Sequence, residues 1–175
     1  MTLYNRRRYA ELTPVFAGYL FDKRVPKGTV FVGMDGDAVA LWDFPSEGEE
    51  NLPEEEGQAP VAPVWPADVA ERMDRYDNLV HEMCPDEPYA YLGILACRPD
   101  DSSGAGTGSA RSRRGLGRRT ARPGIDLGAS LGVPSVLETT NAVNVEVYAR
   151  AGWRVHATSN EIPELTIWVL VHDGK

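Results

Sequence analysis

The sequence predicts a single domain of the α/β class over residues 1–175, with a mixed central sheet flanked by helices. A chain of 175 residues has the length of one ordinary domain, because one hydrophobic core usually serves about 100–200 residues. Apolar residues make up 42% of the chain, which is enough to fill such a core. After an opening helix, strand-like and helical patterns follow in the order β-β-α-β-α-β-α-β-β, which is typical of a mixed α/β sheet.

The first half of the chain is predicted to hold two helices and a hairpin. Apolar residues recur at three- and four-residue spacing over 6–20, so a helix is expected there despite Pro14. The β-rich runs 28–33 and 38–42 flank an Asp-Gly pair, which is a hairpin-turn signal. Helical spacing returns over 67–83.

The second half is predicted to supply the centre of the sheet. The run 89–97 is nearly all apolar, which predicts a central strand buried on both faces. The remaining predicted elements are a helix that ends at Leu131, a strand at 135–139, a short helix near 144–151, and strands at 153–157 and 165–171.

Two segments differ in composition from the rest of the chain. The segment 44–66 is rich in proline and glutamate and is predicted to be an acidic loop. The segment 101–122 is an atypical insert of arginine, glycine and serine. Its last residues, 118–122, place arginines where a helix needs apolar side chains to pack on a sheet. If the insert is genuine, buried arginines or a melted helix are expected at its end; the alternative is that the segment is read out of frame.

The charge and the cysteines exclude several classes of partner. Lys and Arg number 18 against 26 Asp and Glu, a net charge of −8, which argues against nucleic acid or an anionic membrane as partner. No signal peptide or membrane-spanning run is recognised, so a cytoplasmic protein is expected. Cys84 and Cys97 have no His or Cys at ligand spacing; both are interpreted as reduced thiols, and no metal site is predicted.

A glycine-rich turn is a candidate anion site. Arg114-Gly115-Leu116-Gly117 lies between the strand 89–97 and a helical segment. Backbone N–H groups at a helix N-terminus favour a bound anion such as a pyrophosphate, and glycines let the anion approach closely. From these residues alone a flexible Ser/Gly/Arg loop is the commoner interpretation of the same pattern.

A second group of candidate residues surrounds the strand 135–139. Asn144 and Tyr148 are four residues apart, so on a helix they share one face. The Tyr148 phenol is protonated at neutral pH and can return a proton to a leaving thiolate, although a tyrosine packed on the sheet is the commoner outcome. Glu138, at the strand end, is a candidate base if it is partly buried, and otherwise a cap of the next helix.

The run VPSVLETTNAVNVEVYARAGWRV, residues 133–155, resembles the second half of GNAT-type N-acetyltransferases, closest to puromycin N-acetyltransferase-like proteins. The likeness extends to DGDAVALW at 35–42, to YLGILACRPD at 91–100, and to GLG followed five residues later by PGI. The resemblance implies the GNAT fold, with its N-terminal strand and helix missing here. It also implies transfer of an acetyl group from acetyl-CoA to a primary amine of a small molecule, by direct attack in a ternary complex.

The resemblance also implies roles for particular residues. The pantetheine arm of acetyl-CoA is expected in the gap where strand 91–97 parts from the next strand, and Asn144 is expected to contact the arm. Tyr148 is expected to protonate the departing thiolate and Glu138 to accept the proton of the amine. The remaining cofactor-binding residues expected by this resemblance are Leu95, Ala96 and Cys97 on the strand and Arg113, Arg114, Gly115, Leu116 and Gly117 at the pyrophosphate.

Several alternatives stay open at the level of sequence. A second register of the glycine loop, Ser103 with Gly106 and Gly108, fits the family spacing equally well. Because the loop is atypical, a catalytically impaired acyl-CoA-binding or regulatory module is the alternative to an active enzyme. Tyr89, Tyr91 and Trp42 either line an apolar amine pocket or pack in the core. The sequence does not decide the amine or whether the chain forms a homodimer.

Overall fold

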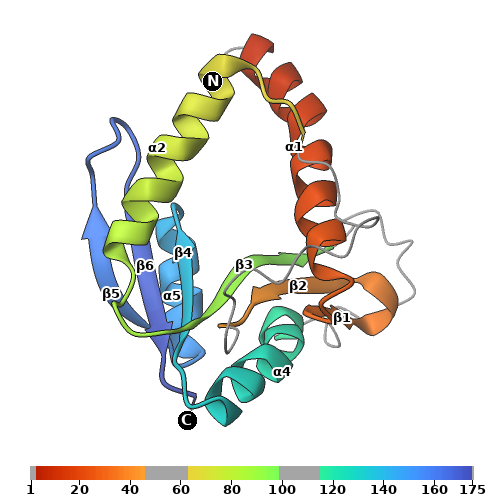
Figure 1. Ribbon diagram of the computed structural model, residues 1–175, viewed down its shortest axis with the longest axis vertical. Helices are drawn as coiled ribbons and strands as arrows, with labels where there is room; N and C mark the ends of the chain where they lie inside the picture. Colours follow the sequence, from red (N-terminus) through yellow and green to blue (C-terminus); the bar gives the residue numbers. More distant parts are fainter. Residues whose placement is uncertain (1–2, 46–62, 99–114, 175) are drawn as a thin grey trace, which may run out of the picture.

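A computed structural model describes residues 3–45, 63–98 and 115–174 of the chain. Figure 1 shows a twisted sheet with helices on both sides. Along the chain the elements are α1 (Leu3–Arg24), β1 (Val30–Gly33), the 3-10 turn η1 (Met34–Gly36), β2 (Ala38–Asp43), α2 (Ala67–Met83), β3 (Ala90–Cys97), α4 (Leu116–Ser130), β4 (Ser135–Thr139), α5 (Ala142–Arg150), β5 (Arg154–Ser159) and β6 (Ile167–His172).

The six strands form one mixed sheet in the order β1-β2-β3-β4-β6-β5. All neighbouring pairs are antiparallel except β3 and β4, which are parallel. This parallel pair is short, because only Ala90 with Ser135 and Tyr91 with Val136 are in register. From Leu92 onward β3 pairs with β2 alone. The sheet therefore opens between β3 and β4, as Figure 1 shows.

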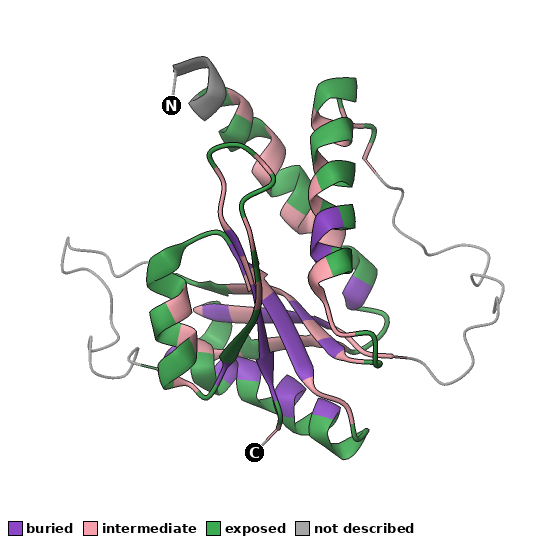
Figure 2. Ribbon diagram, turned by 90° about the vertical axis from the view of Figure 1, so that its left-hand side faces the viewer, coloured by how far each residue is buried: buried purple, intermediate pink, exposed green. Residues whose placement is uncertain are grey.

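The core lies on both faces of the sheet. On one face, α4 and α5 cover a cluster that includes Trp42, Leu92 and Leu137. On the other face, Val136, Val169 and Val171 of the sheet pack with residues at the end of α2. In Figure 2 the buried residues concentrate on the strands and on the helix surfaces that face them. The two faces are thus separate layers that share only the strands.

Helices α1 and α2 lean together at their outer ends, as Figure 1 shows. Arg8 donates two hydrogen bonds to the Asp68 carboxylate, each 2.7 Å long, and the Phe16 and Trp65 rings are in edge contact. At the other end of α1, the buried Arg24 side chain donates to Asp43 at the end of β2. In the part of the chain that the structure describes, no helix combines the length and apolar character of a transmembrane span.

Helix α4 corrects the expectation of buried arginines or a melted helix at residues 118–122. The helix begins at Leu116, and its arginines Arg118, Arg119 and Arg122 are exposed. The positions that face the sheet carry apolar or small residues instead, namely Leu116, Thr120, Ala121, Gly124, Ile125 and Gly128. The helix is therefore amphipathic. Residues 101–114 of the expected insert, and nearly all of the expected 44–66 loop, lie outside the described residues.

Two glycines bring α4 very close to the sheet. A Cβ atom on Gly124 would lie 2.1 Å from Trp42 Cε2, and one on Gly128 would lie 3.1 Å from the Cβ atom of Ala90. Trp42 is completely buried under the helix. The suggestion that Trp42 lines an amine pocket is therefore wrong, and its other interpretation, core packing, is confirmed.

The remaining elements agree with the sequence to within a few residues. The helix over 67–83 and the strand at 135–139 have the expected bounds. The strand expected at 89–97 is central in the sheet order, but its last residues Ala96 and Cys97 are exposed. They are exposed because β3 has lost β4 as a neighbour at that point.

We predict that Gly124→Ala lowers the free energy of unfolding by about 1–3 kcal/mol, because the new methyl group overlaps the Trp42 indole and the helix must move away. Gly18→Ala is the matched control. A Cβ atom on Gly18, within α1, meets no atom within 4 Å, so this change should raise stability by about 0.5–1 kcal/mol. Urea unfolding of both variants measures the difference; equal stabilities would contradict the close approach.

Candidate active site

A groove of about 540 Å³ lies along the open side of β3, between the start of α4 and helix α5. It brings together most of the residues expected to bind a cofactor. Its walls include Leu95, Cys97, Gly115, Leu116, Gly117, Asn144 and Tyr148. Ala96 lies on β3, opposite Val39 of β2, and does not line the groove. Arg113, Arg114 and the alternative register at 103–108 lie outside the described residues.

The start of α4 gives one end of the groove a positive character. Gly115 precedes the helix with a φ of 69°, a left-handed conformation that favours glycine, and no side-chain hydrogen bond to it is recorded in the described part of the chain. The first amides of a helix have no intrahelical acceptor and point outward. Arg118, Arg122 and Arg150 also line the groove. This end is therefore suited to an anion.

Gly117 seats the first turn of α4 against the end of β3. A Cβ atom there would lie 3.4 Å from Cys97 Sγ and 3.6 Å from Leu95 Cδ2. The first helical turn is therefore in van der Waals contact with the strand edge. This packing aligns the amide end of α4 with the unpaired side of β3, and both features border one groove.

Helix α5 contributes Asn144 and Tyr148 to the same groove, as their spacing predicts. Asn141 caps the helix by accepting a hydrogen bond from the Val143 amide, 3.0 Å long. The Asn144 side-chain amide donates to Thr139 Oγ1 over 3.3 Å, which ties it to the end of β4. The Tyr148 ring packs edge-on against Trp153, with ring centroids 6.0 Å apart.

The Tyr148 side chain is half-buried and lines the groove. Among the residues that the structure describes, no hydrogen bond to this hydroxyl is recorded. Burial, together with the negative charge of Glu138, raises the pKa of the phenol above its usual value. Tyr148 therefore remains a proton donor throughout the neutral pH range.

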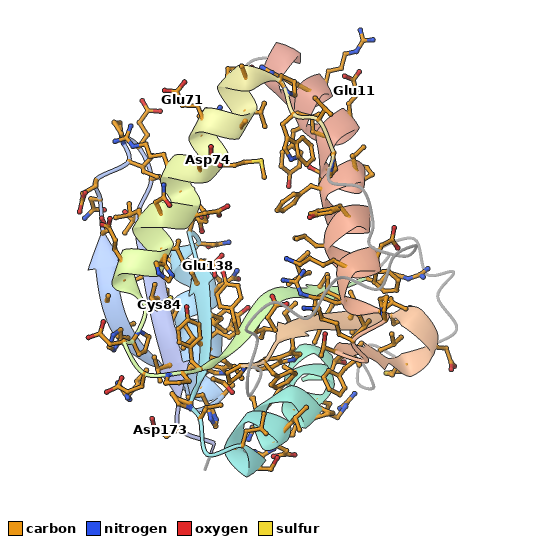
Figure 3. All side chains as sticks on the ribbon, viewed as in Figure 1. Glu11, Glu71, Asp74, Cys84, Glu138 and Asp173 are labelled. Carbon is orange, nitrogen blue, oxygen red and sulfur yellow. The ribbon has the colours of Figure 1, made fainter. Side chains whose placement is uncertain are left out.

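Glu138 lies on β4, half-buried, on the face that α2 covers (Figure 3). Its carboxylate accepts a hydrogen bond from the Tyr91 hydroxyl of β3. Burial raises the pKa of Glu138, and the hydroxyls of Tyr91 and of Tyr76 on α2 oppose this rise because they favour the ionised form. The carboxyl is therefore poised to exchange a proton nearer to neutral pH than an exposed glutamate.

A second cavity, of about 470 Å³, lies on the α2 side of the sheet. Tyr89 and Tyr91 line it, as the sequence suggests for an amine pocket. Its other walls come from the end of β2 and from α2: Asp43, Phe44, Pro45, Asp77, Val80, His81 and Cys84. It combines aromatic and apolar surface with carboxylates.

One thiol and one phenol of this second cavity, Cys84 and Tyr89, interact with each other. Burial raises the pKa of the Cys84 thiol and that of Tyr89 to about 12. Both groups are therefore protonated at neutral pH.

Glu138 is linked to residues of both cavities. Tyr91 lines the second cavity and donates a hydrogen bond to Glu138. The charge of Glu138 also acts on Tyr148, which lines the groove. The carboxylate on one face of the sheet and the phenol on the other therefore influence each other electrostatically.

Sequence reasoning missed three contributors: Tyr76, Asp77 and His172. Tyr76 is four residues before Val80, which lines the second cavity, and this helical spacing is the signal that could have found it. His172 lines the groove, and its Nδ1 accepts a hydrogen bond from the Gly174 amide, 2.9 Å long. Burial, together with Arg122, lowers the pKa of His172, which favours the neutral imidazole. Within 3–45, 63–98 and 115–174, no cluster of three or more His, Cys, Asp and Glu could hold a metal ion.

Several solved structures with a similar fold are acetyltransferases. No protein-family model matches the chain. Arylalkylamine N-acetyltransferase 2 of Aedes aegypti is similar over 93% of this chain and 80% of that one, with 12% identity and a TM-score of 0.52. The histone acetyltransferase HPA2 and related acetyltransferase of Corynebacterium glutamicum is similar over 93% and 75%, with 21% identity and a TM-score of 0.46.

Nourseothricin acetyltransferase is similar over 50% of this chain, with 14% identity and a TM-score of 0.39. The match spans 51% of that protein, about half of its length. The sheet order, the short parallel pair and the helices on both faces, together with the likeness to the Aedes aegypti enzyme, show that this chain has the fold of GNAT-type acetyltransferases.

Proposed function

We propose that this protein is an N-acetyltransferase that moves the acetyl group of acetyl-CoA to a primary amine of a small molecule by direct attack. The observation that carries the proposal is the parting of β3 from β4 after Tyr91. It creates a groove with an anion-binding helix end at one side and a proton donor, Tyr148, at the other, beside the carboxylate of Glu138. The resemblance of residues 133–155 supports a place near puromycin N-acetyltransferase-like proteins.

The groove suits a long phosphorylated thioester. The side of β3 beyond Tyr91 has backbone groups with no strand partner, and an amide-containing arm can bond to them as an added strand does. The diphosphate would lie at Gly115, Leu116 and Gly117, with Arg113, Arg114 and Arg118 adding charge. Asn144, fixed by Thr139, would contact the arm. Acetyl-CoA supplies the activated carbonyl when it is bound.

Glu138 and Tyr148 have complementary roles in this proposal. An amine attacks only in its neutral form, so a group must accept its proton. The half-buried Glu138 carboxylate is a base whose pKa is raised toward the working range. The departing thiolate needs a proton, and the Tyr148 phenol, kept protonated by its raised pKa, donates it.

The second cavity is the proposed acceptor site. Its aromatic wall, from Tyr89, Tyr91 and Phe44, suits an apolar amine body. Asp77 gives this wall a negative charge that attracts the ammonium form of the substrate. A volume of about 470 Å³ accommodates a small molecule.

Cofactor binding is tested through the two thiols. At a concentration ten times its Kd, acetyl-CoA leaves about one-tenth of the protein free. We predict that alkylation of Cys97 by iodoacetamide, measured by mass spectrometry of peptides, slows about tenfold under this condition. Cys97 lines the groove, whereas Cys84 lies in the other cavity and serves as the internal control. Equal rates with and without acetyl-CoA at Cys97 would reject the groove as its site.

Turnover is tested with Tyr148→Phe. The variant keeps the ring contact with Trp153 but has no proton to donate. We predict a fall in kcat of about 100-fold or more at neutral pH, with little change in the KM for acetyl-CoA. Release of the CoA thiol over a panel of primary amines measures the rate. Unchanged turnover in the folded variant removes Tyr148 from the proton-donor role.

The base is tested by the pH dependence. Glu138 acts as a base only when ionised, so kcat/KM should fall as the pH falls through its raised pKa. Glu138→Gln should lower the rate and abolish this acidic limb. If Glu138→Gln keeps the same acidic limb of kcat/KM, another group accepts the proton of the amine. Acetyl-CoA binding without turnover of any amine in the wild-type protein would favour the catalytically impaired binding module instead.

A further inference from the structure

Two phenols from different elements stabilise the ionised carboxylate of Glu138. Tyr91 of β3 donates its hydroxyl hydrogen to Glu138 Oε2, and the hydroxyl of Tyr76 on α2 also lowers the pKa of this carboxyl. Burial and the nearby charge of Glu138 raise the pKa values of both phenols. Both hydroxyls therefore stay protonated and act only as donors to the carboxylate.

The strand register explains why Tyr91 can reach Glu138. Tyr91 pairs with Val136, which is the last pair in register between β3 and β4. Glu138 is two residues further along β4 and so lies on the same face as Val136. A tyrosine side chain is long enough to reach such a diagonal neighbour. The hydrogen bond therefore bridges the two strands where they begin to part.

The Tyr91 ring is itself held in place from the other side. Its register partner on β2 is Asp43, which accepts hydrogen bonds from the buried Arg24. A Cβ atom on Gly93 would lie 3.1 Å from Arg24 Nη2 and 3.5 Å from Tyr91 Cε1, so the guanidinium and the ring share the space that glycine leaves. The Tyr89 ring contacts it edge-on, with centroids 6.4 Å apart.

We infer that Tyr91 is a positioning residue: its hydroxyl orients the Glu138 carboxylate at the β3–β4 opening and keeps it in the ionised form that accepts the proton of the amine. The inference rests on the proposed function for the role of Glu138 as a base. Tyr76 assists from α2. Tyr91 acts through Glu138 and takes no part in the proton transfer itself.

The groups around Glu138 move its pKa in different directions, so each substitution has its own expected direction of shift. Asp77 of α2 raises the pKa of Glu138 by its negative charge, opposite to the effect of Tyr91. The charge of Glu138 also acts on Cys84 at the end of α2, on Tyr89 just before β3 and on Tyr148 of α5. These three groups are neutral at neutral pH because their pKa values are raised. On β6, the register partner of Glu138 is the apolar Val169.

The first measurement needs no catalysis. The full chain, labelled with ¹³C at the glutamate carboxyl carbons, is titrated by NMR, and Glu138→Gln identifies the Glu138 signal. We predict that Tyr91→Phe moves the Glu138 midpoint upward by about one pH unit, since a hydrogen bond to a charged group is lost. Tyr76→Phe should move it upward by less, and Asp77→Asn should move it downward.

Tyr89→Phe is the matched control. Tyr89 directly precedes β3 and lines the same cavity as Tyr91, but its hydroxyl interacts with the Cys84 thiol. The Glu138 midpoint should therefore stay where it is in the wild-type protein. A Tyr91→Phe midpoint equal to that of Tyr89→Phe overturns the inference. Far-ultraviolet circular dichroism checks that each variant is folded, and Tyr76→Phe provides a second removal of a donor if Tyr91→Phe does not fold.

The second measurement separates this inference from the proposed function. Acetyl-CoA binding and thiol release by the wild-type protein are recorded first, and their absence rejects the proposed function and with it the role of Tyr91. If turnover is present, the acidic limb of kcat/KM should move upward in Tyr91→Phe by the same amount as the NMR midpoint. An NMR shift without a shift of the limb overturns the positioning role and leaves the acetyltransferase intact.

Discussion

The short parallel pairing of β3 with β4 is the constraint on which the site depends. Two pairs in register hold the strands together as far as Tyr91, and then the ladder stops. Backbone groups inside a protein need hydrogen-bond partners, so a strand side without a neighbour is open to another extended chain. The same opening connects the two faces of the sheet. It allows Glu138 on one face to influence Tyr148, which packs on the other.

The fold was largely predictable because most elements carry a local signal. The spacing of apolar residues marks α2, and the Asp35-Gly36 turn marks the β1–β2 hairpin. Helix α4 was misjudged because its buried positions after Leu116 are mostly small: Thr120, Ala121, Gly124 and Gly128. Such residues give little apolar signal, and the fully buried Trp42 fills the space that they leave. The exposed arginines next to them made the segment look irregular.

The site was predictable only where its residues are close in sequence. Asn144 and Tyr148 share a helix face by spacing alone, and both line the groove. The partner of Glu138 could not be found in this way, because Tyr91 is 47 positions away. Their contact depends on the register of two strands and on which face each side chain takes. Tyr91 was noted only as an aromatic wall residue, and the direction of its hydroxyl needs the three-dimensional arrangement.

The glycines of α4 have a mechanical consequence for the groove. With Trp42 under Gly124 and Ala90 under Gly128, this helix has almost no space in which to slide or tilt against the sheet. Helix α5, by contrast, has no buried residue, and its ties to β4 include the 3.3 Å bond from Asn144 to Thr139. One wall is therefore stiff and the other compliant. When ligands of different width bind, α5 should move more than α4, so the groove would widen from one side only.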